Sequence, residues 1–148
     1  MSNQEIASAM RSHHDLMVQQ LQDLVQKIET AGPEWKSARD EVAVYLADEV
    51  LPHATAEEST VYRIGSTLEI LSKLIESMLF DHTVIQSLTE SLRGAHAQTQ
   101  ALTVAVQAAK LFEVHAEKEN RFIIAVLEPR KDVDLGAVLG DMRQLLAH

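Results

Sequence analysis

The sequence predicts an all-α protein, an antiparallel up-down-up-down four-helix bundle with a short C-terminal helix. Apolar residues recur every three to four positions through four long segments, which is the helical period. No segment sustains the two-residue alternation of a half-buried strand. The linkers between the long segments are short, so neighbouring helices should run in opposite directions.

The first helix is expected to begin at Ser2, because Glu5 three residues later completes a capping box. Its apolar residues continue at helical spacing as far as Ile28. Gly32 and Pro33 then end this helix and start the next one. Glycine is favoured just past a helix end and proline in a first turn, so this pair marks the first reversal of the chain.

The second helix should continue to about Gly65, with a proline inside it. Pro52 lacks a backbone N–H, and its ring presses against the carbonyl of Asp48. We therefore expect a kink one residue before His53.

The third and fourth long helices follow with similar boundary signals. Ser66 and Glu69 form a second capping box, and Gly94 stops the third helix. The fourth helix should run from about 97 to 127, with an apolar stripe of Leu102, Val106, Leu111, His115, Phe122 and Val126. A tail helix at about 132–147, weakened by two glycines, completes the chain.

Size and composition indicate one domain over 1–148, with the core bundle at about 4–128. The formal net charge of −9 argues against nucleic acid and anionic membrane surfaces, which bind clustered Lys and Arg. No apolar run approaches the ~20 residues of a membrane span, and no secretory signal opens the chain. Cysteine is absent, which excludes thiolate metal sites. We expect a cytoplasmic protein, and the sequence names no protein partner.

Two His-x-x-x-Glu pairs are the main candidates for metal ligands in the sequence. His53 and Glu57, and again His115 and Glu119, stand four residues apart in helical segments. Residues at this spacing share one face, with Cβ atoms about 5–6 Å apart. An imidazole and a carboxylate so placed can both reach one metal ion.

Two further histidines, His14 and His82, lie in the apolar stripes of the first and third helices. Each long helix thus supplies one inward histidine, and alternate helices add a glutamate one turn later. Any single one could be a core histidine satisfied by a nearby carboxylate. Burying the whole set without a metal would be costly, because buried charge must be paired. The joint pattern therefore predicts a metal site.

The remaining histidines fit this pattern less well. His13 points about a third of a turn away from the stripe that holds its neighbour. His96 falls in the loop after the third helix and His148 is the last residue, so both are expected to be solvated.

The order His, His-x-x-x-Glu, His, His-x-x-x-Glu resembles the hemerythrin-like HHE cation-binding domain over about residues 8–128. The local contexts that carry the resemblance are His14-Asp15, His53-Ala-Thr-Ala-Glu57-Glu58, Asp81-His82 and His115-Ala-Glu-Lys-Glu119. This family is a four-helix bundle that holds two non-haem irons. An imidazole and carboxylate donor set without thiolate also suits iron or manganese better than structural zinc.

The resemblance implies a role for each of the six residues. His14 and His53 would bind one iron, and His82 and His115 would bind the other. Glu57 and Glu119 would bridge the two ions, together with an oxo or hydroxo group.

The sequence departs from the oxygen-carrying members of the family, which have a fifth histidine in a His-x-x-x-His pair on the third helix. Here Met78 and Gln86 stand four residues before and after His82. Unless Gln86 or another oxygen group substitutes, a position is left for water or substrate. This departure favours redox chemistry on a small oxygen species over reversible oxygen carriage.

Three nearby residues have open roles. Glu58 is expected to be a solvated or supporting carboxylate rather than a ligand. Tyr45 and Tyr62 could donate hydrogen bonds or trap a radical near the metals. Each lies more than one turn from the nearest ligand, so packing in the core or at its rim is the favoured interpretation.

The leading functional hypothesis is a cytosolic di-iron enzyme that decomposes hydrogen peroxide, as a catalase does. The alternative is a binding module that carries or senses dioxygen, nitric oxide or iron without turnover. A ferritin-like carboxylate protein is less favoured, because that class carries Glu-x-x-His motifs and more carboxylates. A bundle without metal comes last.

Overall fold

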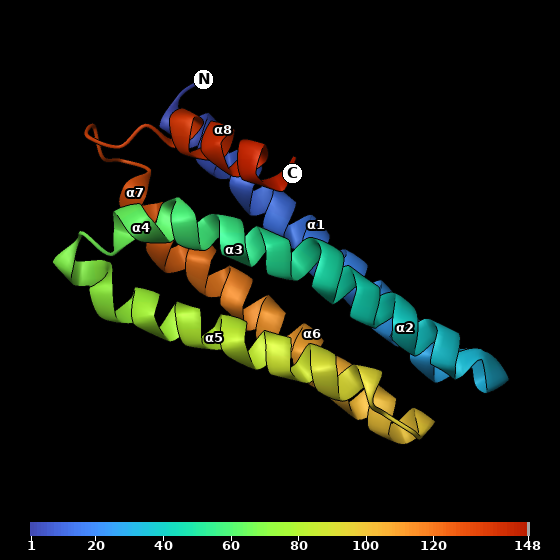
Figure 1. Ribbon diagram of the computed structural model, residues 1–148. Coiled ribbons are helices and arrows are strands. Elements are labelled where there is room, and N and C mark those ends of the chain that lie inside the picture. The colour runs from blue at the N-terminus through green and yellow to red at the C-terminus, as the bar shows by residue number, and fades with distance from the viewer. Residues whose placement is uncertain (148) are drawn as a thin grey trace.

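The computed structural model describes residues 1–147, and nearly all of them are helical (Figure 1). No strand occurs in this range, which confirms the all-helical prediction. None of the helices formed by these residues is long and apolar enough to cross a membrane. His148, which we expected to be solvated, lies outside the described residues.

The long helical segments lie alongside one another as a bundle (Figure 1). Helix α1 packs against α2 and α6, and α5 packs against α6 and α2. Two segments, η2 and η3, are π-helical turns, and η1 is a short 3-10 helix. In chain order the elements are α1 (Asn3–Thr30), η1 (Gly32–Glu34), α2 (Trp35–Tyr45), η2 (Leu46–Val50), α3 (Leu51–Ser59), α4 (Val61–Gly65), α5 (Glu69–Arg93), α6 (Gln98–Lys118), η3 (Glu119–Ile124), α7 (Ala125–Leu127) and α8 (Leu135–Leu146).

The two boundary signals of the first helix are confirmed. The Glu5 backbone N–H donates to the Ser2 hydroxyl, and the Ser2 backbone N–H donates to the Glu5 carboxylate at 2.7 Å. Gly32 has a φ of +56°, in the left-handed region that favours glycine, and Pro33 lies in the first turn of η1.

The irregularity expected before His53 takes the form of the π-helical turn η2. The Leu51 N–H bonds to the carbonyl of Leu46, one residue further back than in an α-helix. This wider turn lies directly before Pro52, which has no N–H to donate. The second π-helical turn, η3, begins at Glu119. Such turns often occur at functional sites, and here both adjoin predicted ligands.

Two sequence predictions about the second and third helices are wrong. The second helix does not continue unbroken to Gly65, because Thr60 leaves the helical conformation with φ −125° and ψ −88°. The capping box of Ser66 and Glu69 does not form. The Ser66 hydroxyl donates instead to the Arg63 carbonyl, and α5 begins at Glu69 without a side-chain cap. Serine and threonine hydroxyls compete in this way for nearby backbone groups.

The predicted apolar stripe of the fourth helix is also wrong in part. Val106 and Phe122 are about half exposed, at 50% and 51%. Small residues form much of the buried face of α6, namely Ala101, Ala105, Ala108, Ala109 and Ala116. Alanine lets neighbouring helices approach closely, and α6 packs against both α1 and α5. Large apolar residues on a surface are common and need no further reason.

The tail helix α8 begins at Leu135, later than predicted, where the Asp134 side chain accepts the Ala137 N–H. The Asn3 side chain holds the preceding loop by donating to the Val133 carbonyl at 2.8 Å and accepting the Leu135 N–H at 3.0 Å. Helix α8 packs against α1 and α3, so it covers the end of the bundle where the chain begins (Figure 1).

Two apolar clusters fill the bundle, and a polar layer separates them. On α1, for example, Met10 belongs to one cluster and Met17 to the other, with buried His14 between them. On α5, Met78 and Ile85 flank His82 in the same way. The polar layer is therefore shielded from water by apolar packing on both sides.

Candidate metal centre

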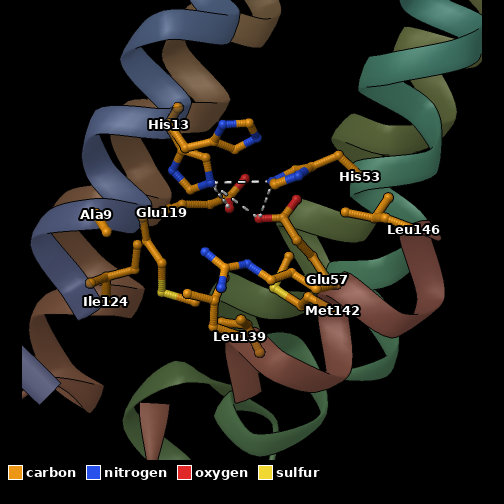
Figure 2. Close-up of a pocket in the computed structure, with 13 residues that line it drawn as sticks. Ala9, His13, His53, Glu57, Glu119, Ile124, Leu139, Met142 and Leu146 are labelled. Carbon is orange, nitrogen blue, oxygen red and sulfur yellow. Dashed lines mark hydrogen bonds and ion pairs between the residues drawn. The ribbon is translucent and has the colours of Figure 1, made fainter. Parts of the chain in front are cut away.

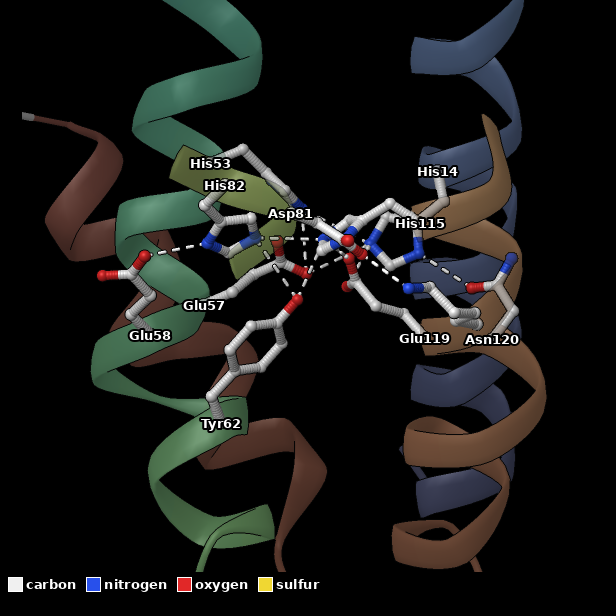
Figure 3. Close-up of polar contacts among 11 residues, drawn as sticks. His14, His53, Glu57, Glu58, Tyr62, Asp81, His82, His115, Glu119 and Asn120 are labelled. Carbon is white, nitrogen blue, oxygen red and sulfur yellow. Dashed lines mark hydrogen bonds and ion pairs between the residues drawn. The ribbon is translucent and has the colours of Figure 1, made fainter. Parts of the chain in front are cut away.

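The structure brings all six predicted ligands together in the polar layer (Figure 3). They come from α1, α3, α5, α6 and the first residue of η3. Each is almost fully buried, with exposures of 1% to 6%. The six are His14, His53, Glu57, His82, His115 and Glu119.

One half of the cluster contains His14, His53 and Glu57. The Nε2 atoms of the two imidazoles are 3.3 Å apart. The Glu57 carboxylate lies 3.6 Å from His14 Nε2 and 3.5 Å from His53 Nε2. These atoms could hold a metal ion between them.

The other half contains His82, His115 and Glu119, and Glu57 reaches this group as well. The Nε2 atoms of His82 and His115 are 3.0 Å apart, and His115 Nε2 lies 2.6 Å from the Glu119 carboxylate. Glu119 also lies 3.7 Å from His14 Nε2, across the cluster. Both carboxylates therefore lie within reach of both histidine pairs.

The outer nitrogen of three imidazoles is held by an oxygen acceptor. His115 Nδ1 donates to Asp81 at 2.9 Å, and His82 Nδ1 donates to Glu58 at 2.8 Å. His14 Nδ1 donates to the side-chain oxygen of Asn120 at 2.8 Å. Lys118 adds a contact of 2.6 Å to Asp81. Such partners fix the ring orientation and leave the inner nitrogen free to accept.

The inner face of the cluster is consequently rich in electron-pair donors. The Nε2 atoms of the three oriented imidazoles carry lone pairs when Nδ1 is the protonated nitrogen. They converge with two carboxylates that accept hydrogen bonds but donate none when ionised. Buried acceptors without donors are costly, whereas metal cations satisfy them all. The donor set therefore fits metal ions held by nitrogen and oxygen.

The shifted pKa values in the cluster also favour a bound cation. Burial alone would lower the pKa of His14, but the negative charges of Glu119 and Glu57 outweigh it and raise the pKa to about 9. Burial likewise opposes the charge on His115, yet the contacts with Asp81 and Glu119 raise its pKa to about 9. Without a metal cation, His14 and His115 therefore hold a proton more tightly than a free imidazole does, and their positive charge offsets the negative charge of the carboxylates.

The pKa values of the two central glutamates shift in opposite directions. Burial and the charge of Glu57 raise the pKa of Glu119 to about 7. Burial opposes the charge on Glu57 too, but His53 and the neighbouring hydrogen bonds lower its pKa well below the ordinary value. Two buried carboxylates this close cannot both ionise cheaply without a cation, and Glu119 is the one whose ionised form is disfavoured.

The sequence-based interpretation of Tyr62 as a packing residue is incomplete, because its hydroxyl group reaches the cluster. Its hydroxyl lies 3.0 Å from His115 Nε2 and 3.4 Å from His82 Nε2 (Figure 3). The residue is 1% exposed, and burial together with the charges of Glu57 and Glu119 raises its pKa far above the usual value. An oxygen atom thus reaches the half of the cluster where the fifth histidine was missing.

The other residues with open roles are resolved by position. Glu58 supports His82 from outside the cluster, whereas Gln86 is exposed, so the suggestion that it replaces the fifth histidine is wrong. Tyr45 bonds to the Met17 carbonyl and to Gln20, away from the cluster.

Two of the remaining histidines also have clear positions. His96 is exposed in its loop, as expected. The His13 ring lies 5.4 Å from that of His53, at the edge of the cluster. It is largely exposed to solvent, so it does not join the six buried residues.

Sequence reasoning assigned no role to Asp81 or Asn120. Each is a chain neighbour of a predicted ligand, since Asp81 precedes His82 and Asn120 follows Glu119. Each nevertheless supports a histidine from another helix, Asp81 serving His115 and Asn120 serving His14. The only signal in the sequence was that each is a polar residue next to a predicted ligand.

A cavity of about 320 Å³ adjoins the His14 and His53 half of the cluster (Figure 2). Helix α1 contributes Ala9, Met10 and His13 to its lining, and α8 contributes Leu139, Met142, Arg143 and Leu146. The cavity gives this half a space that a ligand could fill.

Comparison with known families identifies one match. The model of the hemerythrin HHE cation binding domain matches residues 5–127. Neither the curated proteins nor the solved structures contain a match. The matched range includes all six buried residues of the cluster and ends before α8.

Proposed function

The chain belongs to the hemerythrin HHE cation-binding family, and from this premise we propose that it holds two iron ions and reacts with small oxygen species. Hydrogen peroxide is the favoured substrate. Decomposition of two peroxide molecules to water and dioxygen balances without any further reductant. The observation that carries the proposal is the convergence of four imidazole Nε2 atoms and two carboxylates in a water-shielded layer.

The proposed ion sites follow the two halves of the cluster. His14 and His53 would hold one iron, and His82 and His115 would hold the other. Glu57 and Glu119 would bridge them, since both carboxylates lie within reach of both histidine pairs. Bound iron would supply the exchange of electrons with the small oxygen species.

Tyr62 is proposed as the oxygen group that takes the position of the fifth histidine. Its hydroxyl contacts the inner nitrogens of both imidazoles in that half. A nearby cation stabilises a phenolate, so metal binding would release the proton that burial retains on this hydroxyl. The Tyr62→Phe variant should then keep its iron and lose any phenolate-to-iron absorption band in the visible range. An unchanged spectrum would contradict this role.

The rest of the chain prepares the site. Asp81, Glu58 and Asn120 orient three of the imidazoles through Nδ1, and the two apolar clusters keep bulk water away. Exclusion of water strengthens each electrostatic interaction within the layer.

The test begins with protein purified after growth with iron. We expect two irons per chain, near-ultraviolet bands of an oxo-bridged centre, and steady release of dioxygen when peroxide is added. Substitution of His53 or Glu119 by alanine should abolish the release of dioxygen. His96→Ala, in an exposed loop, is the matched control and should change neither iron content nor turnover. Iron-loaded protein without turnover would overturn the peroxide assignment, and protein that takes up no iron would overturn the metal assignment.

A second candidate is a module that binds or senses dioxygen, nitric oxide or iron without turnover. The packing of α8 favours it, because this helix touches both α1 and α3, which carry His14 and His53. A change at these residues could therefore reach the C-terminal helix. This alternative predicts a stable ligand adduct, and a changed protease sensitivity of α8, in protein that releases no dioxygen from peroxide.

The proposal also includes the finer points of fold and location. We infer that residues 1–148 form a single domain with an antiparallel up-down-up-down bundle, in keeping with the short connections. A cytoplasmic location is in keeping with the absence of cysteine.

A further inference from the structure

The cavity beside the cluster is larger than the proposed substrate needs. It encloses about 320 Å³, whereas one water molecule accounts for about 30 Å³ of liquid. Hydrogen peroxide, dioxygen and nitric oxide each have only two non-hydrogen atoms. The volume falls instead at the lower end of sites for organic molecules, which span roughly 300–1,000 Å³.

The lining of the cavity is chemically divided. His14, His53, Glu57 and Glu119 form its polar end. Much of the remaining wall is hydrocarbon, contributed by Ala9, Met10, Val61, Leu139, Met142 and Leu146 (Figure 2). A ligand that fills this space should therefore have an apolar body and one polar end.

The apolar wall depends on a part of the chain that lies outside the family match. The match ends at residue 127, and α8 spans Leu135–Leu146. Three apolar residues of α8 line the cavity, and Arg143 adds hydrogen-bond donors. One side of the cavity is consequently supplied by α8, outside the matched range.

We propose that the cavity binds an organic hydroperoxide, with its hydrocarbon part against α1 and α8 and its hydroperoxyl end toward the buried histidines and glutamates. This inference rests on the proposed function, since it assigns a larger ligand of the same chemical class to the same centre. Burial of the hydrocarbon part away from water contributes favourable binding free energy, and hydrogen peroxide has no such part.

The test uses cumyl alcohol, which has the hydrocarbon part of cumene hydroperoxide but no O–O bond to react. The full-length, iron-loaded protein is titrated with it in a calorimeter. We expect saturable binding to one site per chain. Because cumyl alcohol cannot be turned over, its binding reports on the cavity rather than on catalysis. Absence of saturable binding would overturn the inference.

Two matched pairs of variants locate the site. Leu146→Trp fills the cavity from α8, whereas Leu145→Trp places the same group next to it on a residue that does not line the cavity. Leu146 and Leu145 are similarly exposed, at 43% and 50%, so neither change should unfold the bundle. Ala9→Phe and Ser8→Phe form an equivalent pair on α1. The first member of each pair should weaken binding at least about tenfold, which is 1.4 kcal/mol, and the second should leave it within about twofold.

Failure of this inference can be separated from failure of the proposed function. Turnover of hydrogen peroxide without saturable binding of cumyl alcohol would retain the function and overturn the inference. Binding that both tryptophan variants weaken equally would also overturn it, because the ligand would then lie elsewhere on α8. Binding that follows the matched pairs in a protein without peroxide turnover would support the cavity as a ligand site and overturn the function.

Discussion

The two halves of the buried cluster differ in how they are held. The half with His82 and His115 is enclosed, since Tyr62 lies against both imidazoles and each outer nitrogen meets a carboxylate. The half with His14 and His53 faces the cavity. There, one outer nitrogen meets a neutral amide, and the other, His53 Nδ1, has no hydrogen-bond partner among the described residues.

If each half holds one ion, as proposed, this difference gives the two halves separate tasks. Carboxylate partners make an imidazole a more basic ligand and fix its ring, so the enclosed half should hold its ion more firmly. The half beside the cavity has weaker support and more space, which suits exchange of a ligand. Rigid support and ligand access are thus placed on opposite sides of the same pair of glutamates.

Removal of an imidazole from each half should have the largest effect. We expect His115→Ala to lose nearly all bound iron, because His115 contacts His82, Glu119, Asp81 and Tyr62. His53→Ala should retain the ion of the enclosed half and fall to about half the iron content. Metal analysis after dialysis measures both, with circular dichroism as the control for folding. Equal losses of iron in the two variants would contradict the view that the enclosed half holds its ion more firmly.

The next largest effect is the pH dependence of the metal-free protein. His14 and His115, one in each half, have folded-state pKa values raised to about 9. A raised pKa stabilises the fold fully below the unfolded-state value of ~6.5, and this stabilisation is lost as the pH rises towards 9. Glu119, with its pKa raised to about 7, acts in the same direction but at lower pH, between its ordinary value and about 7. The free energy of unfolding should therefore fall from pH 6.5 to 9, by roughly 1 kcal/mol per pH unit for each of the two histidines.

Urea denaturation of the metal-free protein at several pH values measures this trend. Metal affinity should rise over the same range, because imidazoles must lose their protons to bind an ion. His115→Gln removes the titrating group of the enclosed half and should make the slope shallower. A metal-free protein that gains stability between pH 6.5 and 9 would contradict the charge arrangement of the cluster.

Substitutions of the outer partners should give a smaller effect that sharpens the comparison. Asp81→Asn removes the charge that His115 Nδ1 meets and should weaken iron binding about 10- to 100-fold. Asn120→Ala, in the other half, removes only a neutral hydrogen-bond acceptor from His14 and should weaken iron binding less than Asp81→Asn does. Competition with a chelator measures both affinities. The opposite order would show that the half beside the cavity holds its ion more tightly.

The sequence could predict His14 and His82 from their place in apolar stripes, and the other four central residues from local geometry. A spacing of four residues places a histidine and a glutamate on one helical face, whatever the rest of the fold does. For Tyr62 the sequence favoured packing over a hydrogen bond near the metals, for the opposite reason. In an unbroken helix it would point about 140° away from Glu57, but the break at Thr60 separates α3 from α4 and changes this relation.

Partners that come from other helices were equally hidden. Asp81 and Asn120 act on histidines that are 34 and 106 residues away in the chain. Their pairing depends on how the helices pack, and α6 packs through alanines rather than through the large residues that the sequence pattern favoured. One sequence does not specify such contacts, because many packings satisfy the same periodicity.

Gln86 provides the smallest expected effect and the sharpest contrast with Tyr62. Position 86 is rotated about 40° from His82 around the helix axis, and Met78 is rotated by the same angle the other way. The buried face of α5 lies on the side of Met78, which is fully buried, and Gln86 is exposed. Gln86→Ala should therefore leave iron content and absorption spectrum unchanged, and the free energy of unfolding within about 0.5 kcal/mol. If this variant lost iron and Tyr62→Phe did not, Gln86 rather than Tyr62 would be the oxygen ligand in the half with His82 and His115. That result would contradict our description of this half as enclosed.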